Sequence, residues 1–364
     1  MENMNNKENK KPSIGRRILK FIGRFFLWLF LTLLVLIAGL YVLLMYVNKG
    51  PSPYFRDLFV ASAMESSAGG IMAQLFLSDE EIEKIQTKNQ TVSSNEITDT
   101  TLINIVARTD SDEEIIIDHE TNANTTADPD GDGIEIYDVH GATYHGIMMI
   151  VFDPSRVKVG TTDVFKLDGG GTTLMGIVEK YDAVAGINGG KYEDEVGMGL
   201  GGMPEGIVIS NGKLLMGDPN TTYGVYGFTY DNVLVVGNMT AGHAINMGIR
   251  DAVTFGPALI TNGKPAGYTG YGSGLNPRTA IGQRADGAVL LLVIEGRQAN
   301  SVGASYADLI EVMMEYGAVN AANLDGGMSS SMVYNGEEII SNCQIRTPRR
   351  MPTAFIVERR DGNE

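Results

Sequence analysis

Cysteine and histidine are scarce in this sequence of 364 residues. It contains a single cysteine, Cys343, and four histidines, which are His119, His140, His145 and His243. A disulfide framework needs paired cysteines, and zinc sites draw on closely spaced cysteines and histidines. The composition therefore argues against a disulfide-stabilised fold and against a zinc site.

Basic residues are scarce outside the N-terminal segment. Seven lysines and arginines precede residue 25, whereas the part after Lys49 carries 20 basic against 42 acidic residues, a net charge of −22. Proteins that bind nucleic acid need a basic surface for the phosphate backbone. We therefore expect no nucleic-acid partner.

Charged residues are absent between Arg24 and Lys49, where the sequence is "FFLWLFLTLLVLIAGLYVLLMYV". This apolar segment is long enough to span a bilayer. We predict a cytoplasmic basic tail over 1–24, a transmembrane helix over 25–47 and an extracytoplasmic remainder, because basic residues stay on the cytoplasmic side. The predicted location is thus the cell membrane, with a single pass. A cleaved signal peptide is the alternative, with "ASA" at 61–63 as the cleavage site.

Residues 48–132 are predicted to form a helical stem followed by a polar linker. The stem should contain two helical pieces, the second opened by Ser78 with Glu81 three residues on, which is a capping-box pattern. Residues 86–132 are rich in Thr, Asn, Asp and Ser, as is typical of linkers. The compact domain is therefore expected over 133–364.

The linker ends in "DPDGDG", where Asp128, Asp130 and Asp132 alternate as they do at the start of an EF-hand calcium loop. The twelfth position of such a loop is Val139, whereas an EF-hand requires a glutamate there. An acidic turn with weak calcium affinity is the favoured interpretation. The sequence requires no cofactor, a divalent cation such as calcium is possible, and no metal ligands are assigned.

From residue 133 onward, apolar strand-like segments alternate with turns, and helices are few. Two Asn-Gly pairs, at 211–212 and 262–263, lie between apolar segments and predict tight hairpin turns. The clearest helix covers 305–316, with a capping pattern at Ser305 and Asp308 and a closing Gly317. The expected fold class is α+β, with a mixed and largely buried sheet, interspersed helices and one βαβ crossover.

That crossover brings two acidic residues to one edge of the sheet. The predicted buried strand "AVLLLVIEGR" ends in Glu295 and Arg297. The helix follows it, and then a second strand that ends at Asp325. Strand, crossover helix and strand predict parallel strands, whose carboxyl ends meet at one edge. If the strands are neighbours, about 4.8 Å apart, Glu295 and Asp325 can face one bound group. Two unrelated surface acids remain the alternative.

Glycine-rich loops accompany these acids. In "NLDGGMSSSM" the glycines permit a positive φ and a close backbone approach, and the serines offer hydroxyls for an oxyanion. "GINGG" and "LNPRTAIG" are similar loops, and the arginine of the second suits bidentate binding of phosphate or carboxylate, with a surface salt bridge as the alternative. The expected substrate-binding residues are Asn188, Gly189, Gly190, Thr279, Arg297, Gly326, Gly327, Ser329 and Ser330.

Taken together, "INGG", "FGPALITNGK", "NPRTAIGQRADGAVLLLVIEGRQ", "GAVNAANLDGGMSSSMVYNG" and "RRMPTAFIV" resemble the phosphodiester glycosidase family over residues 141–358. The resemblance implies hydrolysis of a glycoside whose leaving group is a phosphate ester. Carried over by motif, the candidates include Asn188, Arg278, Glu295 and Asp325, with serines 329 and 330. The family often has Asp in place of Glu295 and an aromatic residue near Lys191.

We expect Arg278, Glu295 and Asp325 to be the catalytic residues. Arg278 would hold phosphate, Asp325 would act as base or nucleophile at the anomeric carbon, and Glu295 would be its partner acid or orienting group. The expected partner is a phosphodiester-linked glycan of the cell surface, such as an exopolysaccharide or wall polymer. Two alternatives are a membrane-tethered glycan-binding module without turnover and a metal-dependent phosphodiesterase that cuts the P–O bond. The sequence leaves the sugar and the oligomeric state open.

Overall fold

Most of the β structure lies in three sheets. The computed structural model describes residues 14–65, 69–105, 131–167, 169–193, 201–341 and 348–360. The largest sheet has seven strands, in the spatial order β12 (Lys264–Pro265), β11 (Ala258–Thr261), β16 (Ala318–Asn323), β14 (Arg278–Arg284), β15 (Val289–Ile294), β3 (His145–Val151) and β2 (Ile134–His140).

Two five-stranded sheets complete the body of the domain. One has the order β18 (Glu337–Ser341), β17 (Ser331–Tyr334), β5 (Ala183–Asn188), β19 (Thr353–Glu358) and β4 (Val157–Thr161). The other has the order β7 (Lys213–Met216), β6 (Val208–Ser210), β10 (Ile249–Val253), β8 (Thr222–Thr229) and β9 (Leu234–Thr240). Across the described residues, neighbouring strands pair antiparallel. The α+β class is confirmed, with antiparallel rather than mixed sheets.

Three hairpins turn on Asn-Gly pairs, two of which the sequence analysis predicted. Both residues of each pair have a positive φ, a conformation that Asn and Gly adopt most readily. The pairs are Asn211-Gly212 between β6 and β7, Asn262-Gly263 between β11 and β12, and Asn335-Gly336 between β17 and β18.

Three helices lie on the sheets: α5 (Leu174–Lys180), α6 (Ala241–Asn246) and α7 (Tyr306–Glu315). The predicted helix over 305–316 is α7, and its N-terminus has the expected capping box between Ser305 and Asp308. Its inward residues Leu309, Ile310 and Met313 pack on one face of the seven-stranded sheet. Short 3-10 turns occur at η1 (Thr100–Leu102), η2 (Pro154–Arg156) and η3 (Gly327–Ser329).

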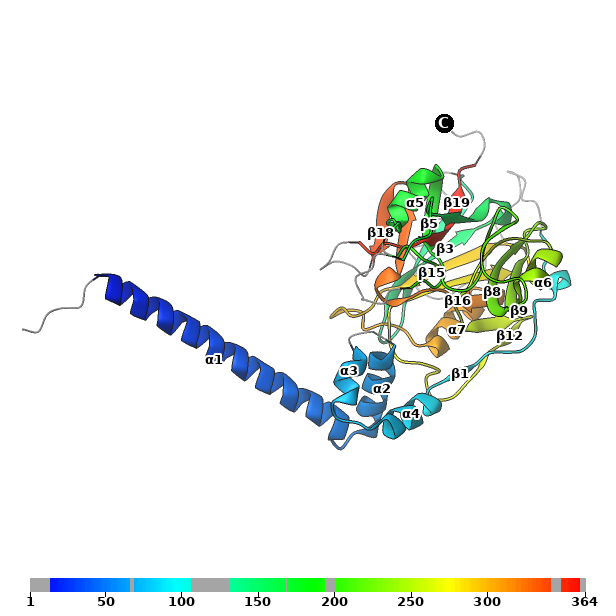
Figure 1. The fold of residues 1–364 in the computed structure, drawn as a ribbon. Coiled ribbons are helices and arrows are strands. Elements are labelled where there is room, and N and C mark those ends of the chain that lie inside the picture. The colour runs from blue at the N-terminus through cyan, green and yellow to red at the C-terminus, as the bar shows by residue number, and fades with distance from the viewer. Residues whose placement is uncertain are drawn as a thin grey trace, which may run out of the picture.

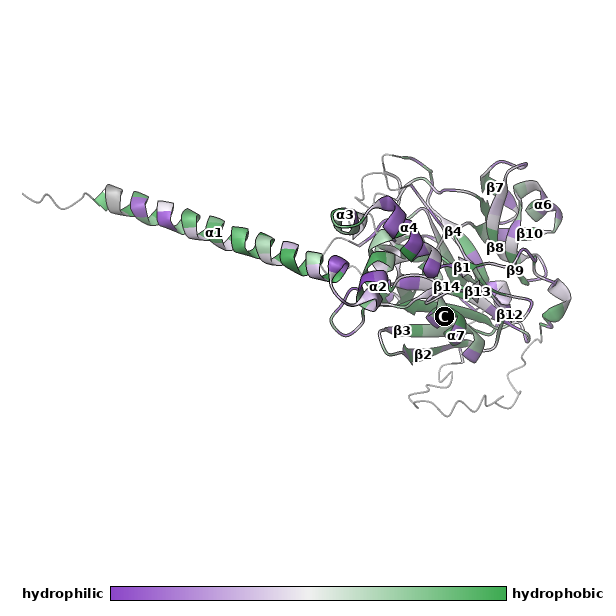
Figure 2. Ribbon diagram, turned by 90° about the horizontal axis from the view of Figure 1, so that it is seen from below, coloured by the Kyte–Doolittle hydropathy of each residue, from purple (hydrophilic) through white to green (hydrophobic). Residues whose placement is uncertain are grey.

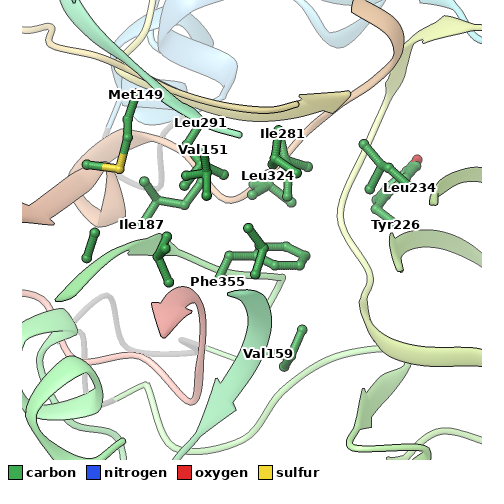
Figure 3. Close-up of a cluster of buried hydrophobic side chains, with 14 of the residues drawn as sticks. Met149, Val151, Val159, Ile187, Tyr226, Leu234, Ile281, Leu291, Leu324 and Phe355 are labelled. Atoms are coloured by element: carbon green, nitrogen blue, oxygen red, sulfur yellow. The ribbon is translucent and has the colours of Figure 1, made fainter. Parts of the chain in front are cut away.

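The main core lies between the sheets. It joins side chains from all three, as Figure 3 shows for Leu291 of the large sheet, Phe355 of β19 and Leu234 of β9. Each of these side chains is fully buried. Burial of such large side chains contributes roughly 1.5–3 kcal/mol apiece relative to exposure, so this core fixes the loops at the sheet edge.

The N-terminal helix α1 (Ile14–Lys49) projects away from the domain (Figure 1). Residues 18–49 have a mean hydropathy of 2.7 in their most apolar window, and that window is not buried by any other part of the chain. Figure 2 shows that most of α1 is apolar. By length and composition this helix can cross a membrane, a test that an N-terminal signal sequence also passes.

Three short helices connect α1 to the domain: α2 (Pro53–Met64), α3 (Gly69–Gln74) and α4 (Asp79–Lys88). The predicted capping box of Ser78 and Glu81 opens α4. Beyond α4 the chain follows the domain surface, where β1 (Thr91–Val92) pairs with β13 (Gly267–Tyr268). Residues 91–105 therefore contact the domain, while the predicted boundary at residue 133 stays a prediction.

Candidate active site

The candidate site lies where β15 and β16 end and β14 begins. Strands β15 and β16 both pair antiparallel with β14, so they run in the same direction, as the crossover prediction requires. They are not neighbours, however, because β14 lies between them. The condition of adjacency is therefore not met, because β14 and β15 form a hairpin and β14 occupies the position beside β15. The backbones of β15 and β16 are thus about 9.6 Å apart, two strand spacings.

The loop after β16 places Asp325 at this edge. The Asp325 amide donates to the Gly189 carbonyl oxygen at 3.1 Å, and the Gly327 amide donates to the Pro277 carbonyl oxygen at 2.8 Å. Gly327 has a φ of +62°, as the sequence analysis allowed for this glycine pair. A Cβ at Gly326 would lie 2.8 Å from the Pro277 oxygen, so Gly326 permits the close approach.

Asn188 joins this loop to two neighbouring strands. Its side-chain nitrogen donates to the Asp325 carbonyl oxygen at 2.5 Å. Its side-chain oxygen accepts from the Thr279 hydroxyl at 2.7 Å and from the Ser331 amide at 3.2 Å. Asn188 and Thr279 are buried. The predicted residues Asn188, Thr279 and Asp325 are therefore brought together, and Asn188 acts by positioning the loop.

Tyr192 lies close to Asp325 on the side of the loop that follows β5. Its hydroxyl is 3.0 Å from the Ser329 hydroxyl and accepts from the Arg349 side chain at 2.9 Å. Burial and then the negative charge of Asp325 raise the pKa of Tyr192 to about 12. The hydroxyl of Tyr192 is therefore protonated at neutral pH. The predicted Ser329 and Ser330 are both buried, with Ser329 held by this tyrosine.

Arg278, at the start of β14, is buried and held by four acceptors. Its side chain donates to the Ala304 and Gly274 carbonyl oxygens, to the Ser273 hydroxyl and to the carboxylate of Glu65, the last at 2.6 Å. Its guanidinium also stacks over the Tyr306 ring, 4.2 Å from the centroid. The predicted grip of Arg278 on phosphate stays a prediction. In this structure the carboxylate of Glu65 occupies one of its donors.

Glu65 lies at the end of α2, 213 residues from Arg278 in the sequence. Besides Arg278, its carboxylate accepts from the Gly274 amide and from the Asn276 side chain, each at 3.0 Å. A Cβ at Gly274 would lie 2.2 Å from the backbone of Ser62, so α2 packs directly on this loop. The stem therefore forms part of the site.

Arg297 offers the more accessible guanidinium. It is exposed, with a φ of +59°, and donates to the Asn276 side-chain oxygen at 2.9 Å. Partial loss of hydration, together with the positive charges of Arg278 and Arg349, lowers the pKa of Arg297. The positive charges of Arg278 and Arg349 thus act on Arg297 beside the Asp325 loop, and this arrangement favours an anionic ligand group.

Glu295 belongs to a different cluster, on the β3 side of β15. Its carboxylate lies 3.3 Å from Nδ1 of His145, and Nε2 of the same ring lies 3.7 Å from Asp138. The Glu295 backbone carbonyl oxygen accepts from the Ser301 hydroxyl at 2.9 Å. Glu295 and Asp325 therefore end strands at one edge but have different immediate partners.

The acidic turn before the domain is only partly described. Asp128 and Asp130 lie outside the described residues. Asp132 accepts through its carboxylate from the Ile134 amide at 2.8 Å and from the Tyr334 hydroxyl at 3.1 Å. In the described parts of the chain no three His, Cys, Asp or Glu side chains are grouped to hold a metal ion. Calcium binding stays a prediction.

Four residues of this site were missed by the sequence analysis. Arg349 lies within the quoted motif "RRMPTAFIV", and Tyr192 follows Lys191 just after "INGG". Their distance from Asp325 along the chain hid their roles. Glu65 and His145 stand in segments without a motif. Their contacts arise only when the stem meets the loop before β14 and when β3 pairs with β15.

Comparison with known proteins finds one family that matches the part of the chain that carries most of this site. Residues 181–358 match the phosphodiester glycosidase family. The range includes Asn188, Arg278, Glu295 and Asp325, whereas the N-terminal helices and β2 to β4 lie before it.

Among the curated proteins, two relatives illustrate the similarity. The SPbeta prophage-derived uncharacterized protein YomE of Bacillus subtilis is 29% identical over 51% of this chain and 29% of its own length. The N-acetylglucosamine-1-phosphodiester alpha-N-acetylglucosaminidase of Bos taurus is 26% identical over 47% of this chain and 36% of its own length. The chain thus spans about a third of these relatives.

The catalytic domain of the zebrafish N-acetylglucosamine-1-phosphodiester alpha-N-acetylglucosaminidase, auto-inhibited by its pro-peptide, has a similar fold. The TM-score is 0.51 at 21% identity, and the alignment covers 62% of this chain and 82% of that one.

Proposed function

The chain carries a phosphodiester glycosidase domain over residues 181–358, and on this basis we propose that it hydrolyses the glycosidic bond of sugar-1-phosphodiesters. The observation that carries the proposal is the position of Asp325. Asp325 lies in the loop that follows the buried strand β16, and this loop lies beside Arg278, Arg297 and Arg349. The Asp325 carboxylate is therefore next to a positively charged surface that suits a phosphate group. The relative from Bos taurus is named for this type of substrate.

The proposed reaction breaks the bond between the anomeric carbon and the phosphate oxygen. Water supplies the oxygen that the sugar gains, and the phosphate ester leaves as an anion. Because this leaving group is a better one than an alcohol, the site needs stabilisation of positive charge on the sugar and a firm hold on phosphate more than it needs a strong acid.

Each residue then has a role consistent with its surroundings. Asp325 is the base or nucleophile, and Arg297 binds the phosphate because its guanidinium is exposed. Arg278 adds positive charge from a buried position and fixes the loop before β14. Glu295, paired with His145, orients that part of the edge or serves as the partner acid.

We further propose that α1 anchors the enzyme in a membrane, with the domain on the outer face. The uncharged helix and the basic residues before it support this orientation. The substrates would then be glycans of the cell surface, such as exopolysaccharides or wall polymers.

The test is to incubate the full chain with a panel of sugar-1-phosphodiesters in water labelled with oxygen-18. We expect free sugar that carries the label, with the Asp325→Asn variant as the inactive control. Label in the phosphate would instead identify a phosphodiesterase that cuts the P–O bond. Binding without release of sugar by a correctly folded chain would identify a glycan-binding module.

A further inference from the structure

An apolar groove of about 670 Å³ lies between the stem and the domain. Its walls include Tyr46 and Val47 at the end of α1, Phe55 and Leu58 of α2, and Met72 of α3. Arg297 and Asn276 also line it, on the domain side. The groove therefore extends from the end of the membrane-length helix to the arginine that we assign to phosphate binding.

The polar end of the groove adjoins the candidate active site. A Cβ at Gly327 would lie 3.6 Å from the Arg297 guanidinium, so this side chain lies over the loop that carries Asp325. Arg297 also donates to Asn276, which holds Glu65. A phosphate on Arg297 would consequently have the Asp325 loop on one side and the groove on the other.

The other end of the groove suits an apolar chain from a membrane. Phe55 and Met72 are 64% and 38% exposed although they are large and apolar. Neighbouring Tyr46, the last aromatic residue of α1, is 65% exposed, and aromatic residues favour the membrane interface. A glycan would leave these walls without polar partners, whereas a hydrocarbon chain gains from contact with them.

We propose that the groove binds the hydrocarbon chain of a lipid-linked substrate, a sugar joined through a phosphodiester to a long-chain lipid alcohol. This inference rests on the proposed function and narrows its substrate class. The lipid phosphate binds Arg297, the chain lies along α2 and α3, and the sugar reaches Asp325. Hydrolysis transfers the oxygen of water to the anomeric carbon, and the lipid phosphate monoester leaves and stays in the membrane.

The first experiment compares two substrates that share one sugar phosphate. In one the phosphate carries a farnesyl chain, and in the other a methyl group. The full chain is assayed in nanodiscs of phosphatidylethanolamine and phosphatidylglycerol. We expect kcat/KM to be at least about tenfold higher for the farnesyl substrate, because its chain is buried in the bilayer beside the groove, whereas the methyl substrate must bind from water.

A matched pair of variants locates the effect. Met72 lines the groove and its neighbour Ile71, which is 61% exposed, does not. Met72→Asp should remove most of the preference for the farnesyl substrate and leave kcat/KM for the methyl substrate unchanged. Ile71→Asp, which adds the same charge to the same helix, should leave both values unchanged. Thermal unfolding of both variants checks that they fold.

A photolabel gives a readout that does not depend on turnover. Farnesyl phosphate with a diazirine at the end of its chain should label peptides of α2 and α3, and Met72→Asp should reduce that labelling. Equal kcat/KM for both substrates, or an equal loss of kcat/KM for both in Met72→Asp, would overturn the proposal that the groove binds the lipid chain. The proposed function would still stand. If neither substrate is cleaved, the proposed function fails. The groove is then decided by the photolabel, and labelling confined to other elements overturns it.

Discussion

The ends of β15 and β16 look alike in the sequence and differ in the structure. Each strand is largely buried and is followed by an acidic residue, Glu295 after β15 and Asp325 after β16. Asp325 lies in a glycine-containing loop that Asn188 holds by a hydrogen bond, and its negative charge helps to raise the pKa of Tyr192. Glu295 instead meets His145 from the outer neighbour β3. The two acids are thus separated by β14 and placed in different electrostatic surroundings.

This difference assigns unequal roles to the two carboxylates. A base or nucleophile must reach the reacting carbon while the phosphate is held, and the guanidiniums gather beside Asp325. Glu295 has a hydrogen-bonding partner of its own in His145, and this partner limits its freedom to reach substrate.

Asp325→Asn should have the largest effect. The amide retains the size of the side chain but neither accepts a proton nor attacks the anomeric carbon, so we expect kcat to fall by about 10²–10⁴-fold. Initial rates with a sugar-1-phosphodiester measure this loss, and KM should change little. A variant with nearly normal kcat would remove Asp325 from the chemistry and make the two strand ends equivalent again.

Glu65→Ala tests how strongly the stem stabilises β14, the strand that separates the two acids. Glu65 forms an ion pair with Arg278 at the start of β14, so its loss should lower the free energy of unfolding. Loss of one partner from a buried ion pair costs about 3–5 kcal/mol. Glu65 retains 29% exposure of its side chain, so solvent screening reduces the expected destabilisation to about 1–2 kcal/mol.

Thermal unfolding of the full chain measures this loss as a lower Tm. Glu65→Gln is the matched control, since its amide oxygen still accepts hydrogen bonds, and its loss should be smaller. An unchanged Tm combined with faster hydrolysis would show that the stem carboxylate blocks Arg278 instead of supporting it.

Glu295→Gln should reduce kcat by only about tenfold, in keeping with an indirect role through His145. The same assay as for Asp325→Asn gives the comparison directly, and His145→Asn provides a second change in the same pair that should have a similar effect. A loss as large as that of Asp325→Asn would place Glu295 at the reacting atoms as the second carboxylate.

Tyr192→Phe should have the smallest effect at neutral pH, about 1 kcal/mol, from the loss of the hydrogen bonds to Ser329 and Arg349. Its pH dependence is more specific. The pKa of Tyr192 is raised from 10 to about 12 in the folded state. The neutral form is favoured by folding, so its stabilisation is fully present below pH 10 and is lost as the pH rises towards 12.

The measurement is the free energy of unfolding between pH 9 and 12, as the difference between wild type and Tyr192→Phe. That difference should fall by up to about 3 kcal/mol across the range, so that Tyr192→Phe becomes the more stable protein at the alkaline end, and other buried tyrosines cancel in it. A difference that stays constant with pH would mean that the hydroxyl of Tyr192 ionises normally, away from the charge of Asp325.

Much of the fold could be predicted because its signals are local. The Asn-Gly turns need a positive φ, Ser305 and Asp308 cap α7, and an apolar segment of strand length marks β15. The common direction of β15 and β16 followed from the helix between them. Their spacing did not, because the hairpin partner β14 and the crossover strand β16 compete for the same position beside β15, and packing decides that competition.

The sequence pointed to several residues that lie together in the structure, and it gave no sign of some of their contacts. Asn188, Thr279 and Asp325 lie together, since Asn188 ends β5, Thr279 is near the start of β14 and Asp325 lies in the loop after β16. Arg278 was expected to hold phosphate, and its ion pair with Glu65 had no signal in either segment. Such a contact depends on how α2 packs on Gly274, which no local pattern specifies.

The sequence by itself determined the apolar N-terminal helix, the antiparallel hairpins and the loops with a family pattern, because each depends on hydropathy, turn chemistry or spacing within a short segment. The tertiary structure alone decided that β14 separates the two acids, that the stem carboxylate meets Arg278, and that an apolar groove leads from α1 to Arg297. These features join residues far apart in the chain, and burial and charge pairing in three dimensions bring them together.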